Sequence, residues 1–136
     1  MEYMIVGFCA ALGGIARYLV GLMLPATTLG FPWGTLAANL TGAFLLAYIT
    51  HYFVERTNMS AAWAAGWGTG FCGAYTTFSS FCVDSIKLLY RNAYWEFGAY
   101  ILLSLIGGLV VTLIAFKVAD WQLMHHKQME AHEEND

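Results

Sequence analysis

The residues best suited to chemistry in this 136-residue chain lie in the stretch 66–85, GWGTGFCGAYTTFSSFCVDS. Its glycines permit close backbone approach, and Phe78 and Phe81, three residues apart, would share one face of a helix. Hydroxyl groups that lipid could not satisfy are supplied by Thr76, Thr77, Ser79 and Ser80. We therefore predict that this stretch lines a protein interior or an ion pathway.

Two polar side chains in the preceding apolar segment are also candidates. Thr35 and Asn39 are four residues apart and would stack on one helical face beside Gly42. The Asn39 amide either hydrogen-bonds a neighbouring helix or presents its N–H groups to an anion. Both interpretations remain open, whereas His51 is expected to be an interfacial histidine.

Arg17, in GGIARY, lies inside the first apolar segment. A guanidinium there costs about 2.5–3.5 kcal/mol unless it reaches the interface or finds a partner. It either extends to the nearby interface or anchors an anion-attracting vestibule. Near the C-terminus, a stripe at four-residue spacing combines hydroxyl and small side chains: Tyr100, Ser104, Gly108 and Thr112.

The elements that position these residues are predicted to be membrane helices. The chain is 59% hydrophobic and only 11% charged, against about 25% charged in soluble domains. Its long uncharged runs each reach the roughly 20 residues that suffice to cross a bilayer, and they are Tyr18–Val54, Thr57–Val83 and Phe97–Phe116. We predict an all-α membrane protein with four spans over residues 1–121 and a polar, flexible tail over 122–136.

The third segment is too long for one upright span. Residues 57–87 would extend about 46 Å as a helix, whereas the hydrocarbon core measures about 30 Å. We expect an interruption at the glycine-rich start of the stretch 66–85. Carbonyl groups freed by such a break need protein, water or an ion, so a buried ion site is predicted.

Several other classes are disfavoured. No nucleophile–base pair or metal-ligand cluster lies within the spans, so the chain is not expected to be an enzyme. Cys9, Cys72 and Cys82 form no C-x-x-C pair and are read as small buried hydrophobes. The first segment is expected to remain as a span rather than to be a cleaved signal peptide, and no nucleic-acid partner is expected.

The loop charges give no firm orientation. One side of a four-span chain would carry Arg56, Lys117 and Lys127, and the other Lys87 and Arg91. Because the basic residues are divided almost evenly between the two sides, the chain could insert in either orientation. Together with polar faces on three helices that need a partner, this even division predicts an antiparallel homodimer.

Taken together, GGIARY, GTLAANLTGAF and GFCGAYTTFSSF resemble the small dual-topology fluoride channels of the Fluc or CrcB family, over about residues 4–118. The resemblance implies passive fluoride export through two pores of an antiparallel homodimer in a bacterial inner membrane, with a structural sodium ion between the subunits. The family commonly has GGxTTFSTF where this chain has GAYTTFSSF, with mild departures at Ala74, Tyr75 and Ser80.

The resemblance also implies roles for individual residues. The main-chain carbonyls of Gly73 and Thr76 would hold the sodium ion, and the fluoride-contacting residues would be Asn39, Phe78, Phe81, Tyr100 and Ser104. From their positions in the sequence we add the hydroxyls of Thr35, Thr77 and Ser80 to the candidate pore, and Arg17 to a candidate vestibule. Thr112 is added from its spacing alone.

Two alternatives remain. A small proton-coupled multidrug exporter would need an intramembrane carboxylate, for which Asp84 is the only candidate in the spans. A structural membrane subunit would use the small and hydroxyl residues only for helix packing.

Overall fold

The computed structural model describes residues 2–27, 30–57 and 59–133, and all regular structure in these ranges is helical. Two of the segments, η1 and η2, are π-helical. The elements in chain order are α1 (Glu2–Met23), α2 (Trp33–Tyr48), η1 (Ile49–Phe53), α3 (Val54–Thr57), α4 (Ala61–Ala65), η2 (Gly66–Cys72), α5 (Gly73–Tyr75), α6 (Phe78–Tyr90) and α7 (Tyr94–Glu133).

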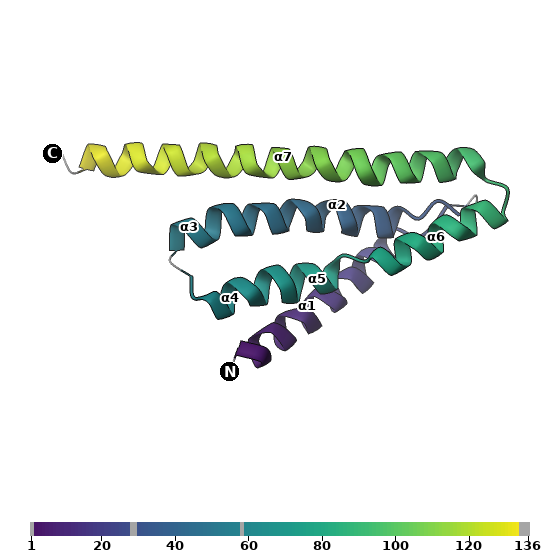
Figure 1. The fold of residues 1–136 in the computed structure, drawn as a ribbon, viewed down its shortest axis with the longest axis horizontal. Helices are drawn as coiled ribbons and strands as arrows, with labels where there is room; N and C mark the ends of the chain where they lie inside the picture. Colours follow the sequence, from purple (N-terminus) through teal and green to yellow (C-terminus); the bar gives the residue numbers. More distant parts are fainter. Residues whose placement is uncertain (1, 28–29, 58, 134–136) are drawn as a thin grey trace.

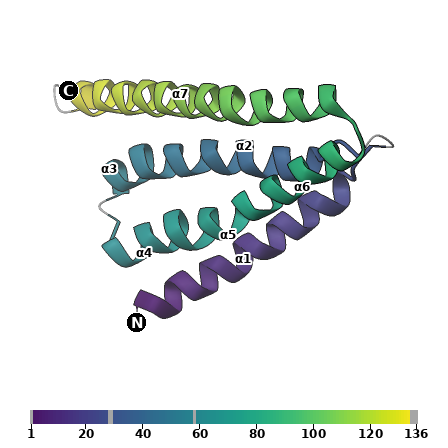
Figure 2. The same cartoon turned by 45° about the vertical axis from the view of Figure 1, so that its right-hand side comes forward.

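These elements form four rods that run back and forth (Figures 1 and 2). The first rod is α1, the second is α2 continued by η1 and α3, and the fourth is α7. The third consists of α4, η2 and α5, followed after a break by α6, which crosses obliquely toward the start of α7. Both termini lie at the same end as the link between α3 and α4, so the predicted arrangement of four rods is confirmed.

Among the described residues, two helices are long and apolar enough to cross a membrane, judged by length and composition. They are α1 and the part of α7 from Tyr94 to His126. Along α7, Leu102, Leu105 and Leu109 are 58%, 66% and 63% exposed. Leucines in such a row belong against lipid or another protein chain, in agreement with a membrane protein.

The predicted position of the break in the third rod was wrong. The glycine-rich residues 66–72 form the continuous segment η2, which packs along α1. A Cβ atom on Gly70 would come within 2.6 Å of the Val6 carbonyl oxygen, and one on Gly13 within 2.2 Å of the Phe71 carbonyl oxygen. These glycines therefore serve close helix packing, and the rod breaks further along, at Thr76 and Thr77.

The last helix is longer than predicted. The four spans were expected to end by residue 121, but α7 continues to Glu133, and residues 134–136 lie outside the described ranges. Two side-chain contacts hold the second rod against this part of α7. The Tyr48 hydroxyl donates to Gln122 Oε1, and His51 Nε2 lies 2.7 Å from Asp120 Oδ1. Whether residues 122–136 are flexible stays a prediction.

Candidate functional site

The site is organised around the break between α5 and α6. Helix α5 ends at Tyr75, and both Thr76 (ψ 160°) and Thr77 (φ −152°, ψ 116°) are extended. The Thr77 side chain then caps the new helix, because its Oγ1 accepts from the Ser80 N–H at 3.2 Å. The chain thus ends one helix before Thr76 and begins the next after Thr77, whose side chain caps it through Ser80.

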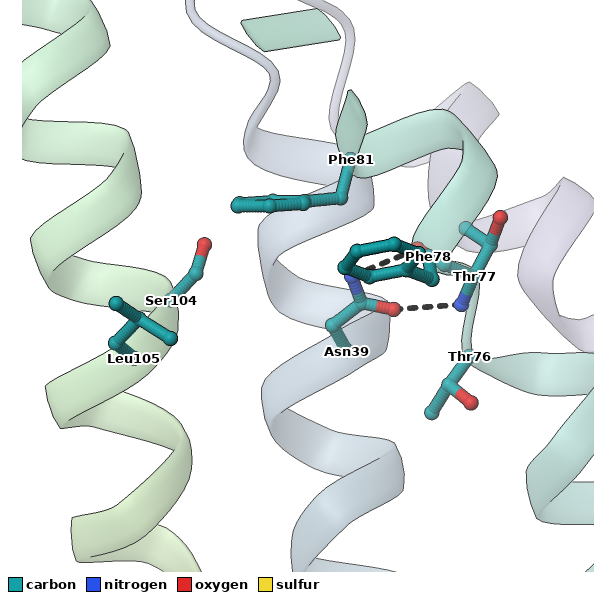
Figure 3. Close-up of a pocket in the computed structure, with 7 residues that line it drawn as sticks. All are labelled: Asn39, Thr76, Thr77, Phe78, Phe81, Ser104 and Leu105. Carbon is teal, nitrogen blue, oxygen red and sulfur yellow. Dashed lines mark hydrogen bonds between the residues drawn. The ribbon is translucent and has the colours of Figure 1, made fainter. Parts of the chain in front are cut away.

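Asn39 of α2 holds the main chain of this break. Its Oδ1 accepts from the Thr77 N–H at 2.7 Å, and its Nδ2 donates to the Thr77 carbonyl oxygen at 3.1 Å (Figure 3). In an unbroken helix the Thr77 N–H would donate to the Gly73 carbonyl. Asn39 therefore satisfies the extended backbone at mid-chain and leaves the Gly73 carbonyl without its usual donor.

A pocket of about 300 Å³ opens beside Asn39, between α2, α6 and α7 (Figure 3). The Phe81 ring lies 5.8 Å from the Phe78 ring and 5.2 Å from the Tyr100 ring, measured between centroids. The predicted common face of Phe78 and Phe81 is confirmed. The pocket is lined by Asn39, Thr76, Thr77, Phe78, Phe81, Ser104 and Leu105.

Two hydroxyl groups on α7 are buried beside these rings. Tyr100 is fully buried in a cluster with Phe31, Leu36 and Leu88 at the end of the bundle. Within the described part of the chain, neither the Tyr100 hydroxyl nor Ser104 Oγ makes a hydrogen bond of good geometry, although the Thr35 side chain lies close enough to interact with the Tyr100 hydroxyl. A buried hydroxyl without a partner is unfavourable by itself, so both groups are suited to a ligand or water.

Arg17 opens onto a second pocket, of about 310 Å³, whose wall also carries Thr35, Thr77 and Ser80. The Thr77 hydroxyl contacts Ser80 Oγ at 3.1 Å. Thr77 lines both pockets, so the cationic side chain and the hydroxyl groups lie along one connected set of walls.

The sequence suggested Asp84 only as the coupling carboxylate of an exporter, and its contacts with Thr35 and Lys87 were missed. Its Oδ2 accepts from Thr35 Oγ1 at 2.8 Å, and its Oδ1 lies 3.6 Å from Lys87 Nζ. The spacing of Asp84 and Lys87 on one helix could have suggested their pairing. No spacing could have revealed the bond to Thr35, which lies on another helix.

On the other side of the break, Gly73 and Thr76 border a groove of about 530 Å³ walled largely by small side chains. A Cβ atom on Gly73 would meet nothing within 4 Å. For Thr76 no donor to the main-chain carbonyl is recorded among the described residues. Carbonyl oxygens that lack donors are suitable ligands for a hard cation, and the described residues hold no group of three or more His, Cys, Asp or Glu that could serve instead.

The structure thus brings most of the predicted site residues to one region. Asn39, Thr77, Phe78, Phe81 and Ser104 share the first pocket or its wall, and Tyr100 packs on Phe81. Near the far end of the stripe on α7, the glycine that packs against α2 is Gly107, since a Cβ on it would lie 3.1 Å from Leu40 Cδ2, whereas nothing lies within 4 Å of one on Gly108.

Comparison with known proteins gives concordant results. The family described as "CrcB-like protein, Camphor Resistance (CrcB)" matches residues 4–116. The chain is 47% identical over 114 residues to a protein of Latilactobacillus sakei named Fluoride-specific ion channel FluC 1, covering 84% of each chain. It is 48% identical over 111 residues to Fluoride-specific ion channel FluC 2 of Listeria innocua, covering 82% of this chain and 84% of the other. A protein of Bacillus cereus, Fluoride-specific ion channel FluC 1, is 37% identical over 125 residues, or 91% of each chain.

Proposed function

Because the chain belongs to the CrcB family and its relatives are named fluoride-specific ion channels, we propose that it conducts fluoride ions passively across a membrane. These names describe channels, in agreement with the expectation that the chain is not an enzyme. The observation that carries the proposal is the pair of buried hydroxyls of Tyr100 and Ser104 beside the Phe81 ring and the Asn39 amide.

The pore proposal rests on hydrogen-bond donors in an apolar bundle. Fluoride is small and strongly hydrated, so a pore must replace its water with donors. Asn39 has two amide N–H groups and gives one of them to Thr77, which leaves the other for an anion. The hydroxyls of Tyr100 and Ser104 add donors, and the rims of the Phe78 and Phe81 rings carry partial positive charge.

We also assign a role in this pathway to the second pocket. Arg17 places a fixed positive charge near the hydroxyls of Thr35, Thr77 and Ser80, and such a charge raises the local concentration of anions. A negative-inside potential would favour anion exit by about 2.3 kcal/mol per 100 mV. The local enrichment of anions and the membrane potential would together favour passive export of fluoride across the plasma membrane, here the bacterial inner membrane.

The antiparallel homodimer remains part of the proposal. Its support is the exposed leucine row on α7, the nearly even division of basic residues between the two ends, and the groove at the break. In such a dimer each subunit would contribute to two pores. The carbonyls of Gly73 and Thr76 from both copies would meet near the two-fold axis and coordinate one sodium ion. The ion would take the place of the hydrogen-bond donors that these oxygens would have in a continuous helix.

The proton-coupled exporter has less support. It needs an intramembrane carboxylate that is open to its cargo, whereas Asp84 is bonded to Thr35 and lies beside Lys87. A purely structural subunit would leave the Tyr100 and Ser104 hydroxyls unexplained.

The deciding experiment is efflux from liposomes that contain the purified chain. We expect rapid fluoride efflux, negligible chloride efflux under the same gradient, and no dependence on a proton gradient. Exhaustive replacement of sodium by a bulky organic cation should reduce the fluoride efflux slowly and reversibly. Equal fluoride and chloride rates, or efflux no faster than from empty liposomes, would remove the channel proposal.

A further inference from the structure

A second contact between α2 and the third rod lies on the other side of the break. Thr41 Oγ1 is 2.8 Å from the Tyr75 hydroxyl. Tyr75 is the last residue of α5 and is only 7% exposed. Its ring also stacks on Phe71, with centroids 5.8 Å apart. The hydroxyl contact therefore joins the buried end of α5 to Thr41, which lies on an exposed face of α2.

The direction of this hydrogen bond follows from the neighbouring contacts. Thr41 Oγ1 donates its single proton to the Ala37 carbonyl oxygen of its own helix at 2.6 Å. Its lone pairs remain available, so the Tyr75 hydroxyl is the donor to Thr41. The chain of bonds from Tyr75 through Thr41 to Ala37 fixes the tyrosine ring relative to the backbone of α2.

Between the two contacts, Thr76 lies directly against α2. A Cβ atom on Gly42 would come within 2.2 Å of Thr76 Cγ2 and 3.1 Å of Tyr75 Cδ1. The absence of a side chain at Gly42 therefore admits the break. Three nearby positions of α2 hold three consecutive residues of the third rod: Asn39 holds Thr77, Gly42 admits Thr76, and Thr41 holds Tyr75.

We propose that Thr41 and Tyr75 are positioning residues for the cation site at the break. Asn39 fixes the residue after Thr76 and the Thr41–Tyr75 bond fixes the residue before it, so the direction of the Thr76 carbonyl is set from both sides. The inference rests on the proposed function, since it concerns the sodium ion held by Gly73 and Thr76. It goes beyond that function by assigning sodium affinity to two side chains that line neither the first pocket nor the groove at the break.

The test is the sodium dependence of thermal unfolding of the purified protein, with a bulky organic cation as the replacement ion. The sodium concentration that gives half of the stabilisation measures affinity without relying on transport. We expect Tyr75→Phe and Thr41→Val each to raise this concentration about three- to tenfold, as expected for the loss of one hydrogen bond that orients a ligand. Thr41→Ser, which keeps the hydroxyl, should restore the wild-type value.

The control is Tyr48→Phe, which also removes a hydrogen bond from a tyrosine hydroxyl to another helix, here to Gln122. It should lower the melting temperature in the absence of sodium without changing the half-stabilising concentration. The double variant Tyr75→Phe/Thr41→Val should shift that concentration no further than the larger single effect, because both changes break the same bond.

Each outcome is decisive. If both single variants behave like Tyr48→Phe, or if their effects add in the double variant, Thr41 and Tyr75 do not act as a positioning pair. If the wild-type protein shows fluoride efflux but no stabilisation by sodium, the cation site and this inference fail while the channel stands. Absence of fluoride efflux from a protein that sodium does stabilise would instead overturn the channel and leave the inference standing.

Discussion

At the scale of single residues, the Asn39 amide can make two kinds of interaction, one with the Thr77 backbone and one with an anion. Its oxygen and one N–H satisfy the Thr77 backbone, and only the second N–H remains for an ion. The sequence had left two readings open, a bond to a neighbouring helix or donors to an anion. The hydrogen bonds to a neighbouring segment are observed, and they leave one amide N–H of Asn39 available to an anion.

Replacing Asn39 by aspartate should separate these interactions. A carboxylate can still accept from the Thr77 N–H, but it has no proton for the Thr77 carbonyl or for fluoride. A hydrogen bond to a charged group contributes about 1.5–3 kcal/mol, so we expect Asn39→Asp to lower fluoride efflux at least ten- to hundredfold while the dimer still assembles.

The control for this change is Asn92→Asp in the turn between α6 and α7, where the side-chain oxygen only accepts from the Tyr94 hydroxyl. It should keep wild-type efflux. Efflux at the wild-type rate from well-folded Asn39→Asp would remove this residue from the pore.

The Phe81 ring contacts both Phe78 and Tyr100, so Phe81→Ile should reduce fluoride efflux by tenfold or more through loss of an aromatic rim beside the buried hydroxyls. Phe44→Ile is a matched change, because Phe44 stacks only on Tyr48 and lies outside the pocket. Melting temperatures of the two variants should fall by similar amounts. Equal efflux from both would mean that Phe81 acts only in packing.

At the scale of elements, the glycines of α1 and η2 have distinct roles that their sequence does not reveal. In the pair at positions 13 and 14, Gly13 faces the Phe71 carbonyl of η2, whereas nothing lies within 4 Å of a Cβ at Gly14. Helix packing therefore depends on one member of an apparently equivalent pair.

Gly13→Ala should destabilise the protein by about 1–3 kcal/mol, because the new methyl group would have to push η2 away. Gly14→Ala should be neutral or stabilising by up to about 1 kcal/mol, the difference in helix propensity between the two residues. Thermal unfolding in detergent would measure both. A similar melting temperature for the two variants would show that α1 and η2 are not in close contact.

How far the sequence predicts this structure depends on the kind of signal. Long uncharged runs in the sequence located the four rods. The break was misplaced because glycine is equally suited to interruption and to close packing, and only the neighbouring helix decides between them. Likewise, the bonds from Asn39 to Thr77 and from Thr35 to Asp84 join positions 38 and 49 residues apart, and no periodicity within one helix encodes them.

At the scale of the whole molecule, the two ends of the bundle differ little in basic residues, with Arg56, Lys117 and Lys127 at one end and Lys87 and Arg91 at the other. The basic residues at the two ends therefore give little preference for one orientation in the membrane. Insertion in both directions is the condition for an antiparallel pair formed from one gene product.

We expect tags at the C-terminus to be accessible from both sides of the membrane in intact cells. Lys87→Gln combined with Arg91→Gln should leave one orientation and strongly reduce fluoride efflux from cells. Coexpression with a variant biased in the opposite direction should restore it. A wild-type C-terminus found on a single side would contradict the antiparallel dimer.

The hold of Asn39 on Thr77 also bears on how the protein is made. While the third rod enters the bilayer it must satisfy its own backbone, and a continuous helix does so because the Thr77 N–H returns to the Gly73 carbonyl. The asparagine that separates them lies on α2, which precedes this segment in the chain and would already be inserted. We therefore expect the translocation machinery to receive an ordinary unbroken helix, and the break to form only as the newly inserted helix docks on its predecessor.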